Sequence, residues 1–153
     1  MKKIIFALIF VIALSCSTDS ETDSLVDFTE QNEQEIQDYI QDNNLNAQRS
    51  ATGLYYVIDE PGSGERPNSN SNVTVSYRGF FTDGTVFDES DANGVSFDLQ
   101  QVIPGWTEGI QLFGEGGSGT LLVPSRLGYG NRDFRGIPAG SVLIFEVILI
   151  SVN

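Results

Sequence analysis

The sequence holds one tryptophan, Trp106, in the segment VIPGWTEGIQLF, and it holds no histidine. Its two lysines are Lys2 and Lys3, and its one cysteine is Cys16. Beyond residue 16 the chain therefore lacks the side chains that most often act as thiol nucleophile, imidazole base, Schiff-base amine or zinc ligand. Any chemistry in this part of the chain must be done by carboxylates, hydroxyls and aromatic rings.

Other kinds of site find little support. The glycine-rich run GEGGSG at residues 114–119 lacks the GKS/T ending of a phosphate-binding loop, and we interpret it as a plain loop. Paired acids for glycoside cleavage remain open by composition, because the chain has 21 Asp and Glu residues, although a domain of this size leaves little room for a sugar cleft. The net charge of −13 argues against nucleic acid as a partner. We expect neither a metal nor a cofactor.

Short β-rich runs separated by glycine predict a sheet domain over residues 50–153. Within it, segments 53–58 and 73–81 have the composition of strands. Thr82-Asp83-Gly84 predicts a hairpin turn in which Gly84 supplies a positive φ, with the chain returning along TVFDES. Segment 141–152 is apolar on both faces, which predicts a strand in the middle of the sheet.

Only one segment of this domain, Pro104 to Phe113, has the pattern of a helix of any length. Proline suits a first helical turn, and Trp106, Ile110 and Phe113 fall on one face at helical spacing. One short helix with about five strands predicts an α+β fold, in which a curved antiparallel sheet wraps around the helix.

Four motifs occur in order: VTVSYRGFFTDGTVFDES, FDLQQVIPGWTEGIQLF, LLVPSRLGYG and GIPAGSVLIFEVILISV. Together they resemble an FKBP-type peptidyl-prolyl cis-trans isomerase domain over residues 53–153, and the bacterial surface branch with the macrophage-infectivity-potentiator proteins is the nearest likeness. The resemblance implies an isomerase that acts on proline-containing polypeptides without a cofactor. It also implies macrolides as further ligands.

The resemblance implies a particular site as well. It places Trp106 at the floor of a pocket and gives catalytic roles to Tyr77, Asp88 and Tyr129. Asp88 matches a buried acid of the family, and Tyr129 matches a tyrosine whose hydroxyl bonds a substrate carbonyl, with the backbone N–H of Ile103 as a second donor. The other expected pocket residues are Phe87, Phe97, Val102, Ile103, Ile137 and Phe145.

One departure from the family concerns Asp88. Many relatives carry an arginine shortly after the motif that contains the acid, but the segment DESDANGVSF has none. We therefore expect Asp88 to depend on the Tyr77 hydroxyl, or to recruit Arg132 or Arg135 from the loop GNRDFRGIPAG. Plainer roles stay open at this point: core packing for the tryptophan, a turn cap for the acid, and hydroxyls that meet water for the tyrosines.

The beginning of the chain has the pattern of an export signal. Lys2 and Lys3 precede an eleven-residue apolar run that is too short to span a bilayer, which is typical of a secretory signal peptide over residues 1–15. The segment IALSCS resembles the lipobox of bacterial lipoproteins and implies that Cys16 is acylated and becomes the first mature residue. An ordinary export signal with a cysteine nearby by chance is the alternative. With a single cysteine, no disulfide can form within the chain.

Removal of both lysines would change the net charge from −13 to −15. Residues 16–27 are predicted to be an acidic, solvated tether, followed by a helix and linker over residues 28–49. The spacing from Asn32 to Glu35 resembles a capping box. Because its apolar stripe is narrow, we expect the helix to lie on the domain or on another copy, with a loosely held linker helix as the alternative. The stripe consists of Ile36, Tyr39 and Ile40.

These expectations combine into one functional hypothesis: an extracytoplasmic prolyl isomerase, anchored in a bilayer through acylated Cys16, that assists the folding of exported proteins. The outer membrane of a Gram-negative bacterium is the expected location. One alternative is a chaperone or docking module with weak turnover, which the missing arginine favours. Another is a structural surface lipoprotein with a vestigial pocket.

Overall fold

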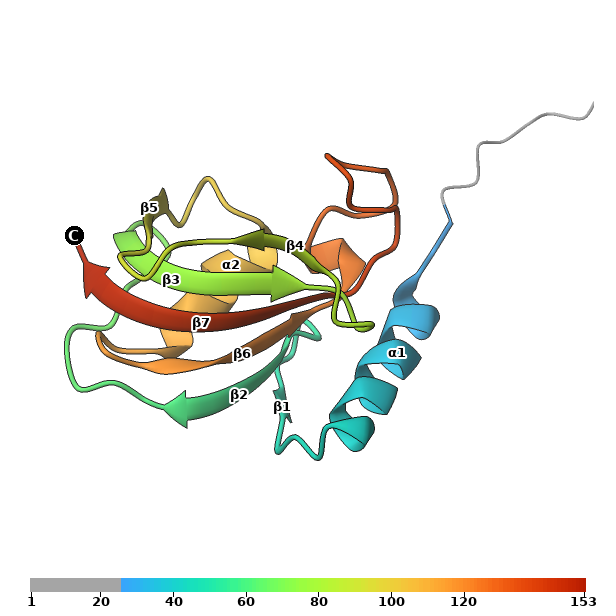
Figure 1. The fold of residues 1–153 in the computed structure, drawn as a ribbon, viewed down its shortest axis with the longest axis horizontal. Coiled ribbons are helices and arrows are strands. Elements are labelled where there is room, and N and C mark those ends of the chain that lie inside the picture. Colours follow the sequence, from blue (N-terminus) through green and yellow to red (C-terminus); the bar gives the residue numbers. More distant parts are fainter. Residues whose placement is uncertain (1–25) are drawn as a thin grey trace, which may run out of the picture.

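The computed structural model describes residues 26–153. The predicted signal peptide, Cys16 and most of the predicted tether lie outside the described residues. Figure 1 shows one twisted sheet, with the short helix α2 against one face and the longer helix α1 beside one end. No helix in the described part of the chain is both long and apolar enough to cross a membrane.

The sheet has seven antiparallel strands in the order β1-β2-β6-β7-β3-β4, and β5 pairs with β3 beyond this path. The predicted turn at residues 82–84 is present, and Gly84 has a φ of 85°. The strands are β1 (Gln48–Arg49), β2 (Tyr55–Glu60), β3 (Asn72–Phe80), β4 (Val86–Glu89), β5 (Val95–Asp98), β6 (Ser118–Val123) and β7 (Leu143–Val152).

The central position predicted for the last strand is confirmed, because β7 lies between β6 and β3. One face of β7 is buried in the main core through Leu143, Phe145, Val147 and Leu149. The opposite face is buried only at the start of the strand, and Ile148 is half exposed farther along. The strand is therefore apolar on both faces, but only one face is covered along its whole length.

The predicted helix in the sheet domain is shorter than expected: α2 covers Pro104–Gly109, and a 3₁₀ turn, η1 (Ile110–Leu112), continues it. A second 3₁₀ turn, η2 (Ser125–Leu127), follows β6. Gly105 lets α2 approach the sheet closely, since a Cβ atom there would lie 2.6 Å from a methyl of Val123. The expected α+β fold, a curved antiparallel sheet around a short helix, is confirmed.

The N-terminal helix α1 covers Thr29–Asp42 and packs on the domain. Ile36 is fully buried in a second core cluster with Tyr55, Leu122 and Val142, so the loosely held alternative is wrong. The capping-box interpretation of Asn32 is also wrong, because the helix begins three residues earlier. Asn32 instead lies within α1, and its side chain is buried against the loop region after β6.

Candidate active site

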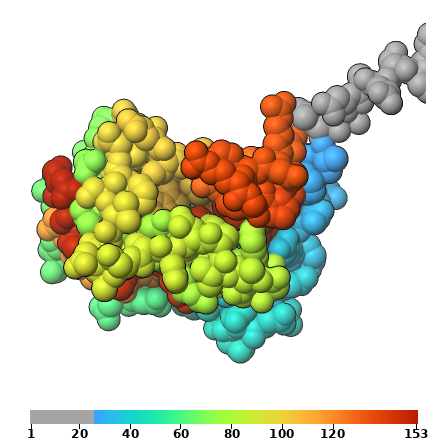
Figure 2. Space-filling model, turned by 45° about the horizontal axis from the view of Figure 1, so that its top comes forward, coloured from blue at the N-terminus to red at the C-terminus, as the bar shows by residue number. Residues whose placement is uncertain are grey.

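A cavity of about 530 Å³ lies between the start of α2 and the sheet. Its volume is within the usual range for a small-ligand site. Figure 2 shows this side of the molecule, where the orange-red loop of residues 128–140, the yellow segment after β5 and the yellow-green β4 segment meet. The lining residues are Tyr77, Asp88, Phe97, Gln101, Val102, Ile103, Trp106, Tyr129, Phe134, Arg135 and Phe145.

Trp106 is held at this cavity by the way α2 begins. Ile103 has extended backbone, Pro104 occupies the first helical turn, and Trp106 follows on the buried side of the helix. Its ring makes edge-to-face contacts with Tyr77, Phe97 and Phe145, at centroid distances of 5.1, 5.2 and 5.4 Å. Such contacts fix the rings beyond simple burial. The lone tryptophan is thus both a core residue and part of the cavity wall.

The indole N–H of Trp106 is buried and has no hydrogen-bond partner within residues 26–153. Most buried polar groups in native structures are paired, so an unpaired donor beside a cavity is a notable feature. The backbone N–H of Ile103 also finds no acceptor in the described part of the chain. Two donors at the start of α2 therefore have no partner among the residues that the structure describes.

Tyr77 and Asp88 are joined across the β3–β4 pair. The Tyr77 hydroxyl donates to Oδ2 of Asp88 at 2.7 Å. Burial raises the pKa of this hydroxyl far above its usual range, and the hydrogen bond and negative charge of Asp88 raise it further. Tyr77 is therefore a neutral donor at every physiological pH.

The expectation that Asp88 is buried is wrong, because its side chain is exposed. The reason is its place on β4, which ends the strand order and has no further strand beside it. Asp88 also forms no ion pair with Arg132 or Arg135 in the described part of the chain. Within residues 26–153 the ion pairs are Arg49–Glu33 and Arg78–Glu146, and neither includes Asp88. Among the described residues, the Tyr77 hydroxyl is the side-chain hydrogen-bond partner of Asp88.

Tyr129 stacks on Phe134, with ring centroids 4.5 Å apart and an interplanar angle of 11°. Its hydroxyl makes no hydrogen bond within the described residues, and the side chain is 37% exposed. Burial raises the pKa of this hydroxyl, the charge of Asp88 raises it further, and Arg135 opposes both. Tyr129 thus offers a neutral and free hydroxyl at the edge of the cavity.

Two expected pocket residues are not in the lining. The ring of Phe87 contacts the ring of Phe145 edge-on, with a distance of 5.6 Å between the ring centroids. Ile137 is buried and exchanges two backbone hydrogen bonds with Phe134. The structure thus brings together eight of the ten expected site residues in the cavity lining, and the other two each contact a lining residue.

Three lining residues had not been expected in the pocket: Gln101, Phe134 and Arg135. A phenylalanine within the polar loop GNRDFRGIPAG was the one visible signal for Phe134. Nothing in the local pattern distinguishes Gln101 from its neighbour Gln100. From the sequence we expect Arg135 as a candidate partner for Asp88 and not as a pocket residue.

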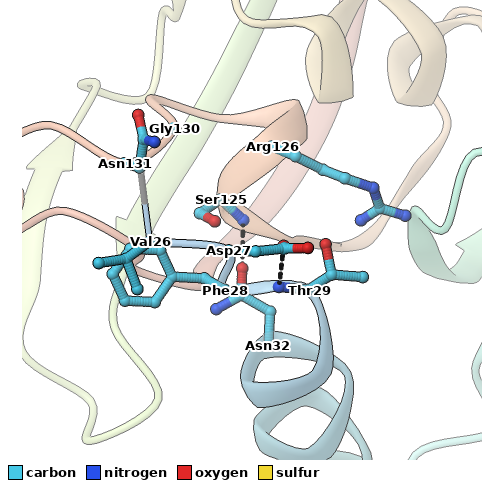
Figure 3. A pocket seen from close by; sticks show the side chains of 9 residues that line it. All are labelled: Val26, Asp27, Phe28, Thr29, Asn32, Ser125, Arg126, Gly130 and Asn131. Carbon is cyan, nitrogen blue, oxygen red and sulfur yellow. Dashed lines mark hydrogen bonds between the residues drawn. The ribbon is translucent and has the colours of Figure 1, made fainter. Parts of the chain in front are cut away.

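A second cavity, of about 350 Å³, lies at the beginning of α1 (Figure 3). Its polar groups serve the protein itself: the Asp27 carboxylate accepts from the backbone N–H of Thr29, and Asn32 accepts from that of Ser125. Arg126, also in the lining, donates to the backbone carbonyl of Thr52. Because no aromatic cluster surrounds this space beyond Phe28, the cavity at Trp106 is the better candidate for a functional site.

An antiparallel sheet curled over one short helix, with an aromatic cavity between them, defines a class of small α+β domains whose site suits an apolar group. The family model described as FKBP-type peptidyl-prolyl cis-trans isomerase matches residues 63–150, which is more than half of the chain. The chain belongs to this family, as its motifs had indicated.

Two curated relatives illustrate the similarity. The probable FKBP-type peptidyl-prolyl cis-trans isomerase FkpA of Neisseria meningitidis serogroup B is 47% identical over 107 residues, which cover 68% of this chain and 39% of the relative. The outer membrane protein MIP of Legionella longbeachae is 44% identical over 105 residues, covering 67% of this chain and 45% of that protein. The matched region thus spans less than half the length of either relative.

Solved structures agree with this assignment. The crystal structure of FkpA from Escherichia coli has a TM-score of 0.74 and 36% identity, covering 82% of this chain and 60% of that one. A peptidyl-prolyl cis-trans isomerase from Pseudomonas syringae pv. tomato has a TM-score of 0.70 and 30% identity, covering 82% of this chain and 96% of that one.

Proposed function

We propose that this protein is a peptidyl-prolyl cis-trans isomerase that binds proline in the aromatic cavity at Trp106. The observation that carries the proposal is the combination of three aromatic rings around one buried indole with donors that have no partner in the described residues. A proline ring fits an apolar floor, and the carbonyls beside it need donors. The family to which the chain belongs supports catalysis over the alternative of a docking module.

The chemistry requires no base or nucleophile, because no covalent bond is broken. Rotation about a peptide bond faces a barrier of roughly 18–20 kcal/mol, since resonance stiffens the C–N bond. X–Pro bonds differ in that cis and trans are close in energy. Resonance separates charge, so water stabilises the planar amide more than the twisted one. Transfer into a water-poor aromatic cavity therefore favours the twisted state.

Each residue then has a physical role. Trp106 forms the floor, while Tyr77, Phe97 and Phe145 exclude water from the rotating bond. The backbone N–H of Ile103 and the Tyr129 hydroxyl donate to substrate carbonyls. Each factor of ten in rate requires about 1.4 kcal/mol, and a few such hydrogen bonds together supply several of these factors. Asp88 orients the Tyr77 hydroxyl. Val102 completes the apolar wall, and Phe87 and Ile137 brace it from behind.

The test is a cis/trans exchange assay on proline tetrapeptides with the purified full chain in non-ionic detergent. We expect acceleration that grows in proportion to enzyme concentration. Quenching or shift of the Trp106 fluorescence by the same peptides measures binding separately, because the chain has one tryptophan. Binding without acceleration at micromolar enzyme would support the docking module instead. An apolar macrolide should compete with the peptides for the cavity.

We also propose an extracytoplasmic location, with the chain divided into a signal peptide (1–15), an acidic tether (16–27), a helix and linker (28–49) and the isomerase domain (50–153). The lipobox-like segment supports acylation of Cys16, and the name of one relative, an outer membrane protein, supports the location. Two or more acyl chains give stable anchoring where one is marginal. The Cys16→Ser variant should leave the membrane fraction, and its retention there would exclude the lipid anchor.

A further inference from the structure

The loop of residues 128–140, which borders the cavity, contains a tight turn with an unusual residue. Phe134 and Ile137 exchange backbone hydrogen bonds of 2.9 and 2.8 Å, which leaves Arg135 and Gly136 as the two central residues. Both have positive φ, 45° for Arg135 and 89° for Gly136. A two-residue turn of this kind favours Asn, Asp or Gly at its first central position. An arginine there is conformationally costly.

The same arginine lines the cavity. Its guanidinium lies 5.3 Å from the centroid of the Phe134 ring, and that ring stacks on Tyr129. A cation over an aromatic face is held by electrostatic attraction to the ring. The turn and the stacked rings together thus place a positive charge at the edge of the cavity.

No acidic side chain among residues 26–153 pairs with this positive charge. Arg135 makes no ion pair and no side-chain hydrogen bond with the rest of residues 26–153, whereas Arg49 and Arg78 pair with acids, and Arg66 and Arg126 donate to backbone carbonyls. Among the lining residues it is the cation, and Asp88 is the anion. An unpaired guanidinium of this kind matches a carboxylate in geometry and charge.

We infer that Arg135 is a specificity-determining residue, which favours substrates with an aspartate or glutamate directly beside the proline. The inference rests on the proposed function, because it takes the cavity as the proline site. A residue beside a bound proline leaves the cavity at its edge, where the loop carries Arg135. The net charge of −13 disfavours acidic peptides at long range, but at physiological salt this repulsion is screened beyond about 8 Å. The charge of Arg135 therefore determines whether an acidic residue beside the proline is favoured.

The test compares matched peptides with the full chain in non-ionic detergent. One pair has Glu or Gln before the proline, and a second pair has Glu or Gln after it. We expect kcat/KM to favour Glu over Gln by about fivefold in at least one pair at physiological salt, corresponding to about 1 kcal/mol, and the preference to shrink as further salt is added. A ratio near one in both pairs would overturn the inference.

Three variants locate the effect. Arg135→Asn removes the charge but keeps a residue that tolerates positive φ, so the ratio should fall to about one. Arg135→Lys should retain much of the preference. Arg132→Asn, in the same loop but outside the lining, is the control and should keep the native ratio. A native ratio in Arg135→Asn, or an equal loss in Arg132→Asn, would contradict the assignment.

Failure of the proposed function is distinguishable from failure of this inference. A neutral Leu-Pro peptide reports whether the chain catalyses isomerisation at all. If it does not, the same Glu and Gln peptides can still be titrated against Trp106 fluorescence. The Kd ratio then tests the preference directly, and the loss of that ratio in Arg135→Asn would support the role of Arg135 in a binding site.

Discussion

The side-chain amide of Asn32 donates to the carbonyl of Gly140 at 2.7 Å, across 108 residues of sequence. The oxygen of the same amide accepts from the backbone N–H of Ser125 at 2.7 Å (Figure 3). Ser125 and Gly140 lie at the two ends of the loop that carries Tyr129 and Arg135. One buried side chain of α1 therefore fastens both ends of the loop that borders the cavity.

We expect Asn32→Ala to lower the free energy of unfolding by about 2–6 kcal/mol. The substitution leaves a buried N–H and a buried carbonyl without partners, and each unsatisfied group costs about 1–3 kcal/mol. Urea unfolding followed by fluorescence measures the change. Gln31→Ala is the matched control, because Gln31 is exposed on the same helix, and it should change the stability by less than about 0.5 kcal/mol. Equal effects would mean that α1 does not hold the loop.

A second prediction concerns the hydrogen bond between Tyr77 and Asp88. Both Tyr77→Phe and Asp88→Asn should lower kcat/KM by about fivefold to tenfold, since a bond to a charged but exposed acceptor contributes about 1 kcal/mol. Because the two groups act as a unit, the double variant should lose hardly more than either single one.

Two substitutions outside the cavity lining are the matched controls for this double-mutant cycle. Tyr56→Phe removes a hydroxyl that bonds Gln48 away from the cavity, and Glu89→Gln changes the acid next to Asp88. Both should keep kcat/KM within about twofold of the native value. Losses in the double variant that multiply would show that Tyr77 and Asp88 act independently.

Stability should fall in alkaline solution, partly through Tyr77. Its folded-state pKa is raised, mainly by burial and then by Asp88, above the unfolded value of about 10. The neutral hydroxyl therefore contributes stability that is fully present below pH 10 and is lost as the pH rises beyond it. Urea unfolding between pH 9 and 11 should show a falling free energy, and Tyr77→Phe should make that fall smaller. An unchanged slope would exclude Tyr77 as a contributor.

Much of the fold could be predicted because its signals are local. Segment 141–152 is apolar on both faces, which marks a central strand, and Pro104 followed by Trp106, Ile110 and Phe113 at helical spacing marks α2. The local pattern assigns Trp106 and Phe145 to the core, and the resemblance of the four motifs to the family is what indicated that they belong to a site.

The sequence could not show what depends on distant partners. Asn32 has the local spacing of a cap, and only the fold reveals that it contacts residues 93 and 108 positions away. The exposure of Asp88 depends on which strand lies at the edge of the sheet, and no motif encodes that position. The positive φ of Arg135 is imposed by the hydrogen bonds between Phe134 and Ile137, against the preference of an arginine.

The final prediction separates the floor of the site from ordinary core packing. Trp106→Leu should weaken binding of proline peptides by about tenfold or more, because it removes the ring that three other aromatic residues contact edge-on. It will also destabilise the fold by a few kcal/mol, so a control of similar burial is needed. Phe113→Leu supplies it, since Phe113 is fully buried directly after the same helical segment but does not line the cavity. Both variants should lower the urea midpoint, whereas only Trp106→Leu should lower peptide affinity, measured by calorimetry at a temperature where both variants are folded. Equal losses of affinity would mean that the tryptophan acts through the general stability of the core, and that proline binds elsewhere.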